Sequence, residues 1–427
     1  MRKHESTNKF KQVTNRFVNL FFLNYNFPLS IKIVSLPFIA FIHCICGLLF
    51  ALVQRLISPI ILIRIGRIYN QRLGHFILEF DWLETTGGNS INEQLRRFPI
   101  RFCLFFLSGK SSNIYLEKIV KKRLRILPRS FLLGVFLTNR LFPDGGKYSV
   151  AFPVRPTDFR YLDNSPVNYT FTTEEQNIAK AILGEIGINS DEPMVCFYIR
   201  DSAYAEKYFP EQPQDFTRYR DCRVANFEKS MEFLADKGYQ VFRMGKYGAK
   251  TLTLKHPNIH DYAFSPLRSD FMDFYLSAKC EFAVATDSGA MMLPIFFRRP
   301  LLLVNIPALH GLPSGKCLTL FQFKTFKEIQ GGSELNLIDI IKKGAAGFES
   351  QQEFTKAGIQ HEENTSDEVL NAVKEMIQLN TNGKNKQAVY DFSQDLFNIR
   401  LASIGLIPVS GKLSLSWLRQ HPNFLEP

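Results

Sequence analysis

The segment CEFAVATDSGAMMLPIFFRRPLLLVNI (280–306) decides the fold of this chain. Its residues 281–285 predict a short buried strand, and a turn of small residues then leads into a helix that opens at Ser288. Residues 301–304 are apolar at every position, which is typical of a strand covered on both faces. A strand, a turn, a helix and another strand in this order indicate a parallel α/β sheet.

The same alternation extends outward from this segment. Before it, the sequence predicts strands at 194–199, 240–244 and 258–263 and helices at 173–186, 226–237 and 270–278. Nearer the N-terminus, residues 60–66 and 102–107 predict two further strands, and Gly74 and His75 open the apolar segment after the first. After residue 326 a polar excursion over 331–365 precedes a helix that begins at a Thr365-x-x-Glu368 capping box.

We therefore expect an α/β protein with two Rossmann-like domains and an N-terminal hydrophobic, membrane-associating segment. The expected parts are a basic N-terminus with a hydrophobic anchor at 1–57, one Rossmann-like domain at 58–170, another at 171–330, and a helical extension at 331–427 that packs back. A chain of 427 residues is long enough for two such domains.

The charge of the chain is concentrated at its N-terminus. The net charge is +12, and residues 1–75 hold ten Lys or Arg residues against Glu5 alone. Within them, residues 33–53 carry no formal charge and are long enough to cross the ~30 Å hydrocarbon layer. Basic residues on both sides favour a monotopic anchor over a single span. A buried core helix is the alternative.

This distribution favours an anionic membrane surface as a partner and argues against nucleic acid, for which no recognition motif is present. A second basic stretch at 115–129 has two interpretations, a helix lying on the bilayer or a solvated helix face. The seven scattered cysteines have no metal-ligand spacing, which indicates reduced thiols in the cytoplasm.

Polar residues follow the predicted strands where ligands gather in open parallel sheets, beyond their carboxyl ends. Arg200 and Asp201 follow the predicted strand at 194–199, and Arg243 and Gly245 lie at the end of the predicted strand at 240–244. Arg220 and Arg223 lie in the loop between these two strands. The turn at 286–289 contains Asp287, Ser288 and Gly289. Guanidinium groups and helix-start amides bind phosphate. A plain capped helix start is the alternative at Ser288.

We expect neither a metal nor another cofactor, because no DxD motif or His/Asp cluster is evident. Arginines and amides would then stabilise the charge on a departing diphosphate.

Five blocks carry a resemblance to a known family: IRIGRIYNQRLGHF (63–76), VCFYIRDSAY (195–204), YRDCRVANFEKSMEFLADKGYQVFRMG (219–245), HDYAFSPLRSDFMDFYLSA (260–278) and ATDSGAMMLPIFFRRP (285–300). They resemble bacterial glycosyltransferases of the two-domain GT-B type from surface-polysaccharide gene sets. The turn at Ser288 resembles the donor site of heptosyltransferase-like enzymes.

The resemblance implies a nucleotide-sugar donor and a glycan or lipid-linked acceptor at the cytoplasmic face of the inner membrane. It implies that Arg200, Arg220 and Arg243 hold the donor diphosphate, with Ser288 and Gly289 beneath it and the segment from Asp261 to Asp273 near the base or ribose. The candidates for the general base are His75, Asp201 and Glu84. A sugar-nucleotide epimerase or hydrolase of the same fold, or a non-catalytic membrane-bound scaffold that binds glycan or nucleotide, are the alternatives.

Overall fold

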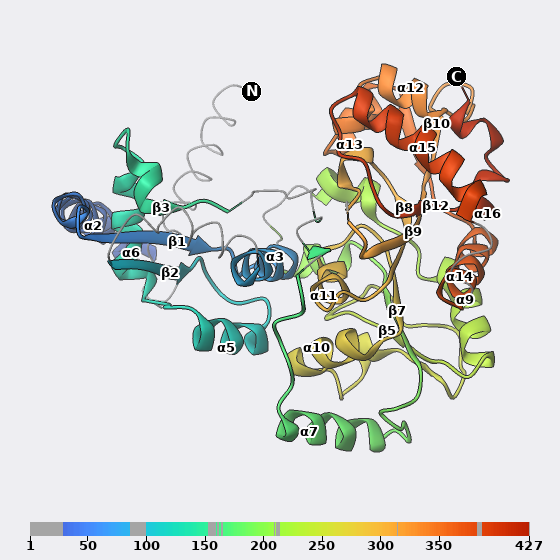
Figure 1. Ribbon diagram of the computed structural model, residues 1–427, viewed down its shortest axis with the longest axis horizontal. Coiled ribbons are helices and arrows are strands. Elements are labelled where there is room, and N and C mark those ends of the chain that lie inside the picture. The colour runs from blue at the N-terminus through green and yellow to red at the C-terminus, as the bar shows by residue number, and fades with distance from the viewer. Residues whose placement is uncertain are drawn as a thin grey trace. The chain divides into compact units, whose positions relative to one another are not determined.

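The computed structural model describes residues 29–85, 100–152, 159, 162–163, 165–208, 210, 214–313, 315–381 and 387–426, without the side chains of 29–40, 381 and 387–391. The chain divides into two compact units, Met1–Val154 (unit 1) and Arg155–Pro427 (unit 2). Each unit contains a parallel sheet with helices around it, so the expected α/β class is confirmed (Figure 1). The finer domain bounds given above stay predictions.

Unit 2 is built on a seven-stranded parallel sheet with the order β12-β9-β8-β7-β4-β5-β6. Its strands are β4 (Met194–Tyr198), β5 (Gln240–Arg243), β6 (Ile259–His260), β7 (Phe282–Ala285), β8 (Leu301–Ile306), β9 (Leu318–Phe323) and β12 (Lys412–Leu413). The chain places β5 and β6 on one side of β4 and then returns to place β7 on the other side. The strand order therefore reverses between β4 and β7.

Helices cover both faces of this sheet, as the alternating pattern predicts (Figure 1). The first part of the unit forms α7 (Thr173–Gly184), α8 (Ala203–Tyr208), η3 (Gln214–Arg220), α9 (Ala225–Asp236), η4 (Tyr262–Phe264), α10 (Asp270–Lys279), η5 (Gly289–Met291), α11 (Met292–Phe296) and η6 (Leu309–Gly311). On one face, Phe227 and Met231 of α9 share a core with Val195 and Phe197 of β4. On the other, the Tyr198 hydroxyl meets that of Ser277 on α10 at 2.5 Å.

Residues 324–426 are more regular than the sequence predicts. They form β10 (Thr325–Glu328), α12 (Leu337–Lys342), η7 (Ala345–Gly347), α13 (Gln351–Lys356), β11 (Ile359–Glu362), α14 (Ser366–Thr381), α15 (Gln387–Ser403), α16 (Leu415–Leu418) and η8 (Pro422–Leu425). The expected polar excursion is thus wrong: β11 pairs antiparallel with β10. The capping box before α14 is confirmed, because the Thr365 hydroxyl accepts from Glu368 N and Glu368 accepts from Thr365 N.

Unit 1 contains a three-stranded parallel sheet with the order β2-β1-β3. Its elements are α2 (Leu29–Ile57), β1 (Ile61–Ile68), α3 (Leu73–Glu84), β2 (Ile100–Leu107), α5 (Ile114–Arg123), α6 (Arg129–Asn139), η1 (Gly145–Tyr148) and β3 (Ser149–Val150). The two predicted strands are confirmed. Position 66 in β1 accommodates only glycine, because an added Cβ would lie 2.5 Å from the ring of Phe105 on β2.

Two helices that are far apart in sequence, α2 and α6, lie against each other at one end of unit 1 (Figure 1). An added Cβ on Gly47 of α2 would lie 2.6 Å from the backbone of Gly134 on α6, so the helices cross with their backbones close together. Within the described residues, no helix combines the length and apolar character needed to cross a bilayer. Membrane association therefore stays a prediction.

The second basic stretch forms α5, and the structure distinguishes between its two interpretations. Leu116, Ile119 and Val120 are buried inside unit 1, while Lys121 and Lys122 are exposed. Because these three apolar side chains are used in the core, the exposed side of α5 is mainly basic, which favours the solvated helix face.

Candidate functional site

The reversal of strand order between β4 and β7 locates the candidate site. In open parallel sheets, a crevice opens at such a switch point beyond the carboxyl ends of the two strands. Here the loops that follow the two strands are bonded together. Arg200 N donates to Thr286 Oγ1 at 2.9 Å, and Thr286 N donates to the carbonyl of Tyr198 at 3.0 Å. Residues 200–201 and 286–288 therefore lie side by side at the edge of the sheet.

Two arginines and two aspartates meet at this point. Arg200 Nε donates to Asp221 Oδ1 at 3.1 Å. Arg220 holds Asp287 through both carboxylate oxygens, with Nε to Oδ2 at 2.8 Å and Nη2 to Oδ1 at 2.9 Å. We call Arg200, Arg220, Asp221, Asp287 and Ser288 the switch-point cluster. The structure thus brings together four of the predicted donor-binding residues, Arg200, Arg220, Asp287 and Ser288, from the segments that follow β4 and β7.

The electrostatics of the cluster favour one more anion. Burial lowers the pKa of Arg200, and the nearby positive charge of Arg220 lowers it further. Burial is the largest influence on Arg220 and acts to lower its pKa, but the charges of Asp287, Tyr219 and Asp221 and the hydrogen bond to Asp287 together raise it. Because the charge of Arg220 disfavours that of Arg200, an incoming phosphate would stabilise the pair. In the described part of the chain, Nη1 of neither arginine has a hydrogen-bond partner.

Ser288 supplies a hydroxyl at the same edge. Its Oγ is buried and makes no hydrogen bond to any described group, which is the state expected of a donor that awaits a ligand. The predicted helix start is only partly correct. Ser288 precedes the 3-10 turn η5, which opens with an exposed Gly289, and the α-helical part that follows, α11, has only five residues. A large helix dipole is therefore absent from this turn, and the arginines carry most of its positive charge.

Arg243 is placed differently from the other two arginines. Its side chain is only 3% exposed, and Nη1 donates to the Lys250 carbonyl at 2.6 Å and to Asp261 Oδ1 at 3.2 Å. Nη2 lies 3.8 Å from Asp201 Oδ2. Arg243 and Asp261 are thus tied to each other and fasten the loop at 245–252. Their expected roles in donor binding stay predictions.

Asp201 forms hydrogen bonds with backbone amides of the neighbouring loops. Its carboxylate accepts from Ala203 N at 3.1 Å and from Ala249 N at 2.9 Å. Gly245, the other predicted residue of this loop, has φ of +155°, and an added Cβ would lie 3.3 Å from Ala263. Both residues shape the loop after β5 beside the switch-point cluster.

Unit 1 carries the other predicted base, His75, in the first turn of α3. Its ring meets the Tyr69 ring edge-on, with centroids 5.4 Å apart. Glu79, which was not predicted from the sequence, lies one turn further along α3 on the same face. Tyr69 N donates to Glu79 Oε2 at 2.6 Å. Burial raises the pKa of Glu79 to about 7, although this hydrogen bond and the charge of Arg67 oppose the shift.

A carboxyl with a pKa near 7 at the carboxyl end of β1 can accept and release a proton at physiological pH. The signal available in the sequence was a single acidic residue inside the apolar run FILEF (76–80). By contrast, the third predicted base, Glu84, ends α3 in an ion pair with Arg123 of α5.

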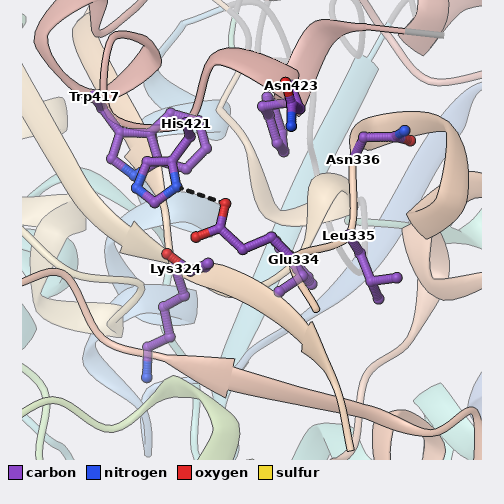
Figure 2. Close-up of a pocket in the computed structure, with 10 residues that line it drawn as sticks. Lys324, Glu334, Leu335, Asn336, Trp417, His421 and Asn423 are labelled. Atoms are coloured by element: carbon purple, nitrogen blue, oxygen red, sulfur yellow. Dashed lines mark hydrogen bonds and ion pairs between the residues drawn. The ribbon is translucent and has the colours of Figure 1, made fainter. Parts of the chain in front are cut away.

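A separate small cavity lies beside β10, where the C-terminal residues cover unit 2 (Figure 2). His421 points toward Glu334 there, with Nδ1 3.1 Å from Oε2, and its Nε2 lies 2.8 Å from Glu368 Oε1. The cavity has a volume of about 40 Å³, far below the several hundred Å³ typical of ligand pockets. It holds water at most, and we assign no substrate to it.

No protein-family model matches the sequence, and no curated protein matches it. Among solved structures, the chain is similar to a glycosyl transferase family 9 protein from Veillonella parvula (13% identity, TM-score 0.43, covering 74% of this chain and 97% of that one). It is also similar to the ADP-heptose LPS heptosyltransferase II of E. coli (14% identity, TM-score 0.38, 74% and 99%) and to the E. coli heptosyltransferase WaaC with ADP (11%, 0.28, 60% and 91%).

These proteins are of the class that the sequence resemblance implies. At identities of 11 to 14% and TM-scores below 0.5, the likeness carries no argument about this chain. The case for function therefore rests on the switch-point cluster and on His75 and Glu79.

Proposed function

We propose that this protein is a glycosyltransferase that moves a sugar from a nucleotide-sugar donor to a glycan or lipid-linked acceptor in surface polysaccharide synthesis, at the cytoplasmic face of the membrane. The observation that carries the proposal is the pair Arg200 and Arg220 at the strand-order reversal of a parallel sheet. That position is where such sheets bind nucleotides, and paired guanidinium groups match the charge of a diphosphate.

In this proposal, Arg200 and Arg220 bind the donor diphosphate, and the Ser288 hydroxyl donates to one of its oxygens. The bond between the sugar and the diphosphate breaks as the acceptor hydroxyl attacks, and negative charge grows on the departing nucleoside diphosphate. Two fixed guanidinium groups stabilise that charge more in the transition state than in the bound donor. A general base takes the proton of the acceptor hydroxyl as the new bond forms.

The transfer proceeds without a metal ion in this proposal, because the acidic side chains of the region already have cationic partners. Asp221 pairs with Arg200, Asp287 with Arg220, and Asp261 with Arg243. We expect a chelator to leave the transfer rate unchanged.

The test is a thermal-shift titration of the full chain in detergent with UDP-, GDP-, ADP- and CMP-linked sugars. A donor that binds the folded protein raises its melting temperature by mass action. We expect one nucleotide class to do so. We expect Arg220→Gln to weaken that ligand by about 10- to 100-fold, since a charge-assisted hydrogen bond contributes about 1.5–3 kcal/mol.

Arg223→Gln is the matched control, because Arg223 lies in the same loop but is 74% exposed and pairs with Glu363. If no nucleotide raises the melting temperature, or if both substitutions weaken the ligand equally, the donor site is elsewhere. Release of free sugar at the full rate without any acceptor would instead favour a hydrolase.

A further inference from the structure

An apolar surface remains uncovered on unit 1, among the described residues of α2. Large hydrophobic side chains of this helix are exposed at Phe41, Ile42, Ile45, Leu48, Leu49, Leu52, Val53 and Leu56. Their spacing of one, three and four residues places them on one side of the helix, in a stripe about 22 Å long at ~1.5 Å per residue. Monomeric soluble proteins rarely leave such a continuous stripe in water.

The opposite side of α2 is fixed to the rest of unit 1. Gln54 is buried, donates to the Ile63 carbonyl of β1 at 3.1 Å and accepts from Asn139 at 3.0 Å. Arg55 donates to Asn139 Oδ1 at 3.0 Å and pairs with Asp144 at 2.5 Å. These bonds hold the helix as part of the folded unit, so only its outer side is available to a partner.

The helix α6 and the turn after it extend this surface. Phe131 is 57% exposed, and its ring packs edge-on against Phe50 of α2 with centroids 6.1 Å apart. Leu141, two residues after α6 ends, is 82% exposed. The exposed apolar side chains of α2, together with Phe131 and Leu141, are called the two-helix face below.

The charge around the two-helix face decides between its possible partners. The sequence of α2 contains Lys32 and Arg55 and no acidic residue. Arg140 and Lys147 are exposed close in sequence to Leu141. Among the described residues close in sequence to Leu141, the acidic one is Asp144, and it is paired with Arg55. A second copy of the chain would bring the same positive charge against itself, whereas an anionic bilayer offers both an apolar layer and opposite charge.

We propose that the two-helix face docks on a bilayer containing anionic phospholipid, with α2 lying in the plane of the interface. The outer side chains of α2, Phe131 and Leu141 enter the boundary between headgroups and acyl chains, and Arg140 and Lys147 lie at the headgroups. This inference rests on the proposed function only in that a membrane-held acceptor gives the surface a use. It places the carboxyl end of β1, with His75 and Glu79, in a unit that the membrane itself holds.

The experiment is sedimentation of the full chain with vesicles of phosphatidylcholine alone and with 30% phosphatidylglycerol. The substitutions are Leu56→Gln and Leu141→Gln, which change residues 80% and 82% exposed on different segments. Neutral glutamine keeps the charge of the protein unchanged, and exposed positions tolerate such changes with little loss of stability. Phe392→Gln, on α15 of unit 2 and 75% exposed, is the matched control.

We expect the wild type to bind the anionic vesicles more tightly than the neutral ones. Each of the two test substitutions should weaken partitioning about tenfold, equivalent to about 1.4 kcal/mol, and the control should leave it unchanged. Equal loss in all three variants, no loss in any, or no preference for anionic lipid would overturn the proposal. So would a wild-type dimer in light scattering that Leu56→Gln converts to a monomer without any vesicle binding.

The nucleotide thermal shift measured on the same variants separates this proposal from the proposed function. Leu56→Gln and Leu141→Gln should keep the full shift, because neither residue lies in unit 2. If the protein binds vesicles but no nucleotide, the docking proposal stands and the proposed donor site is refuted. If it binds nucleotide but no vesicles, the donor site stands and the docking proposal is refuted.

Discussion

The raised pKa of Glu79 predicts how strongly the stability of unit 1 depends on pH, and the size of the effect follows from the structure. The Glu79 carboxyl is half-buried on α3, and this partial burial raises its pKa from 4.5 to about 7. Because the folded-state pKa is raised, its contribution to stability is fully present below pH 4.5 and is lost as the pH rises through 7. A shift of this size corresponds to about 3 kcal/mol at full ionisation, and we expect about 2 kcal/mol after solvent screening.

The substitution is Glu79→Gln, which keeps the size and an acceptor for Tyr69 N but cannot ionise. Relative to this variant, the wild type should lose about 2 kcal/mol of unfolding free energy between pH 5 and pH 8. Most of that loss should fall between pH 5 and pH 7, because above the folded-state pKa the carboxyl is ionised in both the folded and the unfolded protein. The chain contains two tryptophans, Trp82 on α3 of unit 1 and Trp417 in unit 2. Trp417→Phe therefore leaves Trp82 as a reporter of unit 1 in urea titrations.

A difference between Glu79→Gln and the wild type that stays constant from pH 5 to pH 8 would refute the reasoning. It would mean that the Glu79 carboxyl is well solvated and ionises normally. A wild type that gains stability over this range relative to the variant would refute even the sign of the shift. Either result would also remove the reason for considering Glu79 as a proton acceptor.

Three further predictions concern packing and ion pairs. Gly134→Ala should lower the stability of unit 1 by about 1–3 kcal/mol, because the added Cβ would lie 2.3 Å from the His43 carbonyl oxygen. The measurement is urea unfolding followed by Trp82 fluorescence. The control is Gly146→Ala, whose added Cβ meets nothing within 4 Å. Arg243→Ala should lower the melting temperature of unit 2 but have little effect on nucleotide affinity, because it leaves the Asp201 and Asp261 carboxylates without their cationic partner. A variant that keeps its melting temperature but loses nucleotide affinity would contradict this. Burial lowers the pKa of His421, but hydrogen bonds to Glu368 and Glu334 outweigh it and raise the pKa. The loss of unfolding free energy caused by His421→Gln should therefore be largest below pH 6.5 and decrease as the pH rises through the raised pKa. Unfolding of unit 2 can be followed through Trp417 in a protein that also carries Trp82→Phe.

The buried strands were predictable because their residues carry the signal themselves. The apolar runs at 194–199 and 301–304 became β4 and β8, and the helix predicted to begin at residue 173 became α7. The sequence did not predict that polar residues at 337–362 form α12, α13 and β11. These short elements depend on neighbours far along the chain, such as the pairing of β11 with β10.

The candidate site was predictable in its arginines but not in their partners. Parallel strands place their carboxyl ends at one edge, so Arg200 and the turn at Ser288 were expected to be near each other. Which carboxylate each guanidinium holds depends on side-chain geometry between separate loops, and local pattern contains no information about it. Arg243 is the clearest example, because its sequence position resembles that of Arg200 while its side chain is buried against Asp261.

The way unit 2 is closed has a consequence for its synthesis. Strand β12 completes the sheet against β9, Trp417 is buried beside Phe323, and Glu375 of α14 accepts hydrogen bonds from Ser414 and from the amides of Leu415 and Ser416. The sheet thus lacks an edge strand and α14 lacks its partner until residues 412–418 have been translated. Unit 1, which is continuous in sequence, can fold while the rest of the chain is still being made, whereas a nascent unit 2 exposes β9 until the last segment arrives.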